Sequence, residues 1–109
     1  MIQITPELII PLYKKHHKGA CTGTMKNCDE TCYCPMGILA IDSGMLSEDI
    51  DDAYGYFEEQ FGYKKGPMDF YLGFDSNRDF DDSVENVEVF RMGRRCREVL
   101  IAEGLLKNW

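Results

Sequence analysis

Residues 34–41, which read Cys-Pro-Met-Gly-Ile-Leu-Ala-Ile, constrain the fold of this chain more than any other stretch. Proline suits the first position of a helix, because the backbone N–H that it lacks would have no partner there. The residues after Pro35 leave almost no polar face, so their helix is predicted to be buried on most sides. Gly37 would let another backbone approach this helix closely. Gly44 is the expected end of the helix.

A helix is also predicted near the start of the chain. Residues 5–7 (Thr-Pro-Glu) combine a capping hydroxyl, a proline for the first position and an acid for the first turn. The basic residues 14–18 are followed by Gly19, a pattern typical of a helix end. Pro11 leaves two alternatives open, a kink at that point or a later start near Ile10.

Helical spacing continues in the second half of the chain. A helix is predicted from the cap Ser47 to the stop Gly62, with aromatic residues on its core face. Residues 68–74 are short and aromatic, so both a strand and one more helical turn remain open. Residues 75–82 are expected to form an acidic loop. A last helix is predicted from about residue 83 to about residue 106.

The start and middle of this last helix carry two further signals. Asp82 and Glu85 have the spacing of a capping box, which would mark its beginning. Gly93 lies in its interior, where glycine indicates a helix contact or a weak point.

Composition and these segments together predict the fold class. The chain has 109 residues, of which 44% are hydrophobic, enough for one globular domain over residues 1–109. We expect a mainly α fold of about four helices with at most a short strand or hairpin, and α+β as the alternative. There is no apolar run long enough to span a bilayer and no signal-peptide pattern at the start, so no membrane association and a cytoplasmic location are expected.

Charge narrows the choice of partners. The net charge of −7 argues against direct binding of nucleic acid, whose phosphates require a basic face. The one dense arginine group of the sequence comprises Arg91, Arg94, Arg95 and Arg97, and the spacing of the first three predicts a shared helix face. Guanidinium groups on such a face can bind phosphates. The favoured interpretation is that they pair with Glu88 and Glu98 of the same helix, or with the acidic helix predicted after Ser47.

Cysteines supply a second candidate site. The chain has five cysteines, four of them between residues 21 and 34. Their thiols and a nearby imidazole are ligands that zinc prefers. The spacing does not match the paired units of common zinc modules, so buried thiols that bind nothing are the other interpretation. The leading expectation is no cofactor, with zinc as the alternative. The candidate ligands are Cys21, Cys28, Cys32, Cys34 and His17.

Two weaker interpretations involve catalysis and calcium. Cys34 at a helix N-terminus would have a lowered pKa and would act as a nucleophile with His16 or His17, but no motif supports this and burial would make the thiol inert. The residues after Phe74 alternate like the oxygen ligands of a calcium loop, with Phe80 and Asn86 where glycine and glutamate are needed. Solvated acids are the favoured interpretation of that loop. The calcium candidates are Asp75, Asn77, Asp79, Asp81 and Ser83.

Four short pieces of the chain, in order, carry a family resemblance: Lys18-Gly19, residues 34–40, Phe61-Gly62, and residues 73–75 (Gly-Phe-Asp). They resemble small proteins of phages and bacteria that carry a helix, a Lys-Gly turn, a polar loop, a buried Cys-x-x-Gly-x-Leu-type helix and a Phe-Gly segment. That family pattern has one cysteine in this region, so the other cysteines of the loop depart from it. The resemblance implies a compact, mainly helical accessory protein encoded by a phage or mobile element, and no catalytic residues.

These observations predict a small acidic binding protein that is not an enzyme, because no paired catalytic carboxylates, phosphate loop or Ser-His-Asp order is present. It would inhibit or sequester a host factor. The partner is expected to be a host protein, met by the acids of residues 48–59 and 75–82, or a phosphate-bearing small molecule, met by the arginines. The alternative is a zinc-stabilised interaction module built on the loop of residues 21–34. A homo-oligomer is compatible with either.

Overall fold

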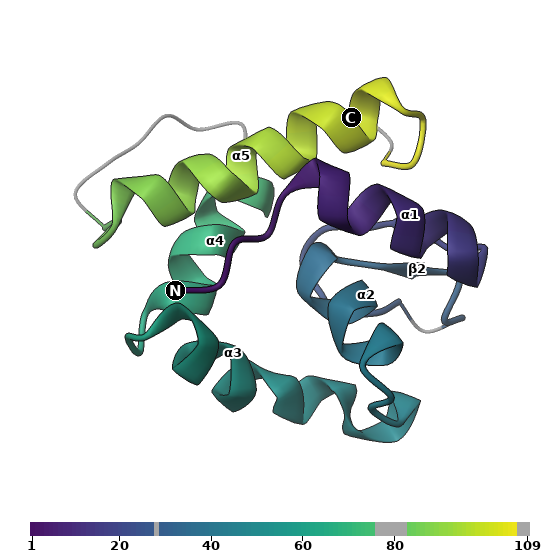
Figure 1. Cartoon of the computed structure of the whole chain (residues 1–109), viewed down its shortest axis with the longest axis horizontal. Coiled ribbons are helices and arrows are strands. Elements are labelled where there is room, and N and C mark those ends of the chain that lie inside the picture. The colour runs from purple at the N-terminus through teal and green to yellow at the C-terminus, as the bar shows by residue number, and fades with distance from the viewer. Residues whose placement is uncertain (28, 76–82, 107–109) are drawn as a thin grey trace.

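The computed structural model describes residues 1–27, 29–75 and 83–106 of the chain. These residues form five α-helices, one 3-10 helix and a parallel pair of very short strands (Figure 1). The mainly α class is therefore confirmed, with one helix more than the four expected. The elements are α1 (Pro6–His16), β1 (Gly19–Ala20), β2 (Cys32–Tyr33), α2 (Pro35–Asp42), η1 (Ser47–Asp52), α3 (Ala53–Phe61), α4 (Gly66–Asp75) and α5 (Val87–Ala102).

The helices enclose one apolar core. Helix α5 runs across the top of Figure 1 with α4 packed beneath it, and α1 and α2 lie together at one side. Residues 1–5 form an extended arm that crosses from α3 to the start of α1, and the backbone N–H of Ile2 donates to the carbonyl of Gln60 at 2.8 Å. Within the described residues, no helix has the length and apolar character needed to cross a membrane. The largest fully buried aromatic side chains are Tyr13, Phe57, Phe70 and Phe74.

Helix α1 begins as predicted and ends earlier than predicted. The side chain of Thr5 accepts a hydrogen bond from the N–H of Leu8 at 3.3 Å, and the helix then continues through Pro11, so it does not start later. It ends at His16, because His17 adopts a left-handed conformation with φ of 55°. Gly19 is therefore not the helix stop; it forms the first residue of β1.

Helix α2 confirms the predicted buried helix. The thiol of Cys34 caps it by accepting a hydrogen bond from the N–H of Gly37 at 3.3 Å. A Cβ atom on Gly37 would overlap the carbonyl oxygen of Met25, so glycine at this position permits the predicted close approach of a second backbone. The helix ends at Asp42, and Gly44 follows with φ of 98°.

The second half of the chain confirms one open alternative and differs from the predictions in two places. Residues 68–74 are helical, the second of the two alternatives, and belong to α4, which already begins at Gly66. The segment after the predicted cap Ser47 starts as the 3-10 helix η1 before α3 continues to Phe61. Helix α5 spans residues 87–102 instead of 83–106.

The later start of α5 has a local cause. The side chain of Asn86 accepts hydrogen bonds from the N–H groups of Glu88 and Val89, at 2.9 and 3.4 Å, so Asn86 is the cap. Glu85 does not close a capping box on this helix, because its N–H donates to the buried carboxylate of Asp69. Asp82, the other member of the predicted box, lies outside the described residues.

Candidate functional site

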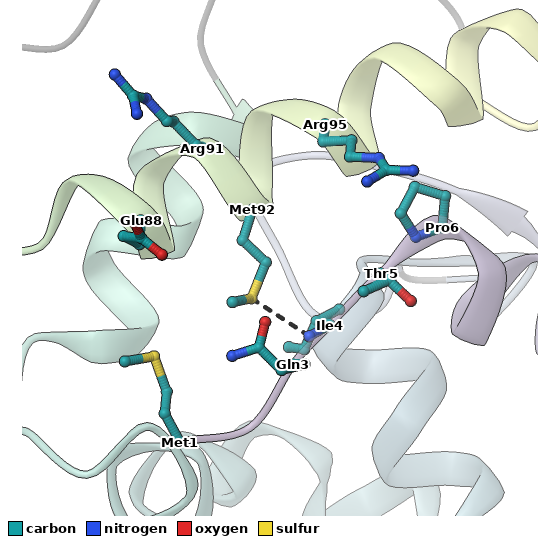
Figure 2. A pocket seen from close by; sticks show the side chains of 9 residues that line it. All are labelled: Met1, Gln3, Ile4, Thr5, Pro6, Glu88, Arg91, Met92 and Arg95. Atoms are coloured by element: carbon teal, nitrogen blue, oxygen red, sulfur yellow. Dashed lines mark hydrogen bonds between the residues drawn. The ribbon is translucent and has the colours of Figure 1, made fainter.

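A cavity of about 230 Å³ lies between the N-terminal arm and helix α5 (Figure 2). Met92 closes its floor, and its sulfur accepts a hydrogen bond from the N–H of Ile4 at 3.3 Å. The exposed side chains of Met1 and Gln3 contribute the arm side of the wall. The cavity is therefore apolar at its floor and has the carboxamide of Gln3 beside it.

Two of the three predicted arginines meet at the rim of this cavity. Arg91 and Arg95 follow each other by one turn of α5, and the guanidinium of Arg91 projects outward from the rim in Figure 2. Arg95 bends toward the start of α1, where its Nη2 lies 2.7 Å from Oε1 of Glu7. Both partners of this ion pair are mostly exposed, so it contributes little to the free energy of folding.

Arg94 does not join the other two arginines. It lies about 100° around the helix from Arg95, because each residue advances the helix by that angle. Its Nε donates to the carbonyl of Gly73 at 3.1 Å, and its guanidinium stacks over the ring of Phe90. Arg97 likewise is 5% exposed and donates to the carbonyl of Phe74 at 2.9 Å. These two arginines therefore stabilise the C-terminal carbonyls of α4.

Arg91 differs from its neighbours on the helix. It is exposed, and within residues 1–27, 29–75 and 83–106 it has neither a hydrogen bond nor an ion pair. Glu88 precedes it by one turn on the same rim, yet the described residues show no ion pair between them. The rim thus carries a cation and a carboxylate that point in different directions, an arrangement around a cavity that the sequence did not predict.

Cys34 is a core residue and not a reactive thiol. Its sulfur is fully buried, lies 3.1 Å from the hydroxyl of Tyr71 and caps α2. Burial raises the pKa of Cys34 to about 11, against the lowering effect of its hydrogen bonds from Tyr71 and Gly37. The nitrogen Nε2 of His16 lies 3.0 Å from the carboxylate of Asp42, so this imidazole is engaged elsewhere. The hypothetical Cys–His pair is therefore not formed with His16.

The predicted zinc ligands are dispersed where the structure describes them. His17 ends α1 with its backbone, Cys34 caps α2, and among the described residues no group of three His, Cys, Asp or Glu side chains could hold a metal ion. Cys21 and Cys32 lie together, half-buried and free. Cys28 lies outside the described residues, so the zinc site stays a prediction.

The acidic segments lie in two places. Glu48, Asp49 and Asp52 of η1 are exposed, as are Tyr56 and Glu59 of α3. Of the calcium candidates, Asn77, Asp79 and Asp81 lie outside the described residues. Asp75 is described, and burial raises the pKa of its carboxyl group.

One buried acid was missed by the sequence analysis. Asp69 is fully buried and accepts hydrogen bonds from the hydroxyl of Tyr63 (2.7 Å) and from the N–H groups of Glu85 (3.2 Å) and Asn86 (2.9 Å). It holds the segment that leads into α5. Its place in an aromatic segment gave no sequence signal of this role.

Comparison of this chain with protein-family models, with curated proteins and with solved structures finds no match.

Proposed function

We propose that this chain is a non-enzymatic binding protein that sequesters a phosphate-bearing small molecule, and that Arg91 at the rim of the cavity between the N-terminal arm and α5 receives the phosphate. The observation that carries the proposal is Arg91, an exposed guanidinium at the rim that has no partner among the described residues. Guanidinium binds phosphate through two parallel hydrogen bonds, which gives both strength and orientation.

The size of the cavity limits what it receives. Sites for drug-sized ligands measure roughly 300–1,000 Å³, whereas this cavity is about 230 Å³. A single small group fills it, while the rest of the ligand, including the phosphate at Arg91, lies over the rim. This supports a ligand that is only partly enclosed.

The polar groups at the rim define the ligand further. The start of α1 adjoins the cavity at Pro6, and a helix N-terminus carries a partial positive charge. Glu88 repels a second anion, but its carboxylate accepts hydrogen bonds from hydroxyl groups. Gln3 adds an amide that both donates and accepts. The combination favours a phosphate that carries neighbouring hydroxyl groups, as in a sugar phosphate.

Titration with ribose 5-phosphate tests the proposal. Binding is measured by calorimetry and by the chemical shifts of the arginine side chains. Loss of a charge-assisted hydrogen bond costs about 1.5–3 kcal/mol, so we expect Arg91→Gln to weaken binding roughly tenfold or more. Lys14→Gln removes an equal charge from an exposed position on α1 outside the cavity, and its affinity should stay within about twofold of the unchanged protein, as expected for a screened surface charge.

Glu88→Gln removes a negative charge from the rim, whereas Arg91→Gln removes a positive one. It should strengthen binding of inorganic phosphate, which has no hydroxyl-bearing sugar. The affinity for ribose 5-phosphate should fall relative to the affinity for inorganic phosphate. Equal affinities of Arg91→Gln and Lys14→Gln would contradict the proposal. So would the absence of both phosphate binding and a co-purified ligand, the latter measured by native mass spectrometry.

A further inference from the structure

A second cavity, of about 390 Å³, lies beside the two short strands. Cys21 and Cys32 line it on the strand side, and Leu105 and Leu106 line it from the turn after α5. The N–H of Ala20 donates to the carbonyl of Leu105 at 2.8 Å, which fixes this turn against β1. The cavity is separate from the one at Arg91 and shares no lining residue with it.

The parallel strands place the two thiols on one face. In the register of the pair, Gly19 lies opposite Cys32 and Ala20 lies opposite Tyr33. Side chains alternate along a strand, and Ala20 and Tyr33 are buried in the core. Cys32 and the residue that follows Ala20, Cys21, therefore face away from the core and into the cavity. A Cβ atom on Gly19 would lie 3.8 Å from that of Cys32, so glycine leaves space beside this thiol.

The two thiols are in reach of each other and open to a ligand. Cys21 and Cys32 line the same cavity from adjacent positions of the strand pair, and both residues are half-buried and in no disulfide. Cys34, the next cysteine along the chain, is fully buried, and its sulfur is hydrogen-bonded to the N–H of Gly37 and the hydroxyl of Tyr71. Among the residues that the structure describes, the cavity therefore offers a pair of thiols.

We propose that Cys21 and Cys32 form a two-coordinate binding site for the soft monovalent cation Cu(I). Thiolates select soft ions, and Cu(I) is satisfied by two of them, whereas structural zinc requires four ligands. Among the described residues no third His, Cys, Asp or Glu completes a group with this pair. The leucine side chains of the turn cover the bound ion with apolar surface, which suits a low coordination number.

The binding step is a proton exchange without electron transfer. Each thiol loses its proton, one S–Cu bond forms at each sulfur, and two protons pass to solvent for every ion bound. Below the pKa values of both thiols, the apparent affinity should rise about 100-fold for each unit of pH, because two protons are released. This dependence distinguishes a dithiolate site from binding at methionine sulfur, which carries no proton.

Anaerobic titration of the fully reduced protein with Cu(I), in competition with a chromophoric Cu(I) chelator, tests the proposal. We expect one ion per chain, a pH dependence of two protons between pH 6 and pH 8, and losses of about 100-fold or more for both Cys21→Ser and Cys32→Ser, since one ligand cannot replace two. Cys96→Ala removes a buried thiol that does not line this cavity and serves as the matched control, with unchanged affinity. Circular dichroism verifies that each variant is folded.

X-ray absorption of the unchanged protein loaded with Cu(I) gives a test that does not depend on whether any variant folds. Two sulfur ligands and no nitrogen or oxygen ligand are expected. Three or more ligands, a large loss of affinity in Cys96→Ala, or full affinity in Cys21→Ser or Cys32→Ser would overturn the proposal.

Discussion

Gly73 of α4 and Gly93 of α5 each lie against the backbone of the other's helix. A Cβ atom on Gly73 would overlap the carbonyl oxygen of Phe90, and one on Gly93 would overlap the carbonyl oxygen of Phe70. Each glycine thus provides the space into which the partner helix fits. This reciprocal contact brings α5 close to α4 and determines the position of the α5 face that carries Arg91 and Arg95.

Gly93→Ala is expected to destabilise the protein. The added methyl group meets backbone atoms, which cannot move aside as a flexible side chain can, and overpacking of this kind costs about 1–3 kcal/mol. Urea unfolding followed by circular dichroism measures the change. Gly55→Ala is the matched control, because it lies in α3, is exposed and has no atom within 4 Å of the added methyl. There alanine should stabilise by about 0.5–1 kcal/mol. Equal effects of the two substitutions would contradict the close crossing.

Asp69→Asn is expected to cost more than the loss of a single hydrogen bond. An amide has one acceptor oxygen, so the nitrogen of Asn would face a backbone N–H of Glu85 or Asn86 and leave a buried donor without a partner. Such a group costs about 1–3 kcal/mol. Tyr63→Phe removes one bond and leaves the acid in place, so it should cost about 1 kcal/mol. Thermal unfolding compares the two, and a larger effect of Tyr63→Phe would contradict the role assigned to Asp69.

The parts of the fold that follow from local chemistry could be predicted from the sequence. Thr5 and Pro6 start α1 because capping and the missing N–H act within a few residues. The buried helix after Cys34 follows from a sequence with almost no polar face. Gly37 and Gly93 could be predicted as close contacts because glycine in a buried or long helix has few other uses.

What depends on distant partners could not be predicted. Residues 68–74 are short and aromatic, and their helical state is set by packing of α4 against α5. Arg94 donates to the carbonyl of Gly73, and Arg95 pairs with Glu7. These partners could be predicted only if the positions of α4 and α1 were known. The sequence shows that three arginines lie within five positions of each other. It does not show which acidic side chains or carbonyl groups of other helices lie within hydrogen-bonding distance of each one.

Thiol accessibility should separate the cysteines into two classes. In the Cys28→Ser background, a neutral alkylating reagent followed by peptide mass spectrometry should label Cys21 and Cys32 in the native protein. Cys34 and Cys96 are fully buried, so they should react only after unfolding. Labelling of Cys34 in the native state at the rate of Cys32 would contradict its place in the core.

The buried thiols also predict how stability depends on alkaline pH. Burial raises the pKa of Cys34 to about 11 and that of Cys96 to about 12, from the ordinary value of 9.0. A group whose pKa is higher in the folded protein stabilises it fully below the unfolded value, and this contribution is lost as pH rises toward the folded value. Stability should therefore fall above pH 9, by roughly tenfold in the folding equilibrium constant per pH unit for each thiol.

Cys96→Ala isolates one of these contributions. The substitution removes the thiol that donates to the carbonyl of Ile4 at 3.4 Å, so the variant is less stable at neutral pH. Its loss of stability between pH 9 and pH 10 should nevertheless be smaller than that of the unchanged protein, by roughly fivefold in the folding equilibrium constant, because one titrating group is gone. Urea unfolding at pH 8, 9 and 10 measures both slopes. Parallel pH dependences would show that Cys96 does not titrate differently in the folded and unfolded chains.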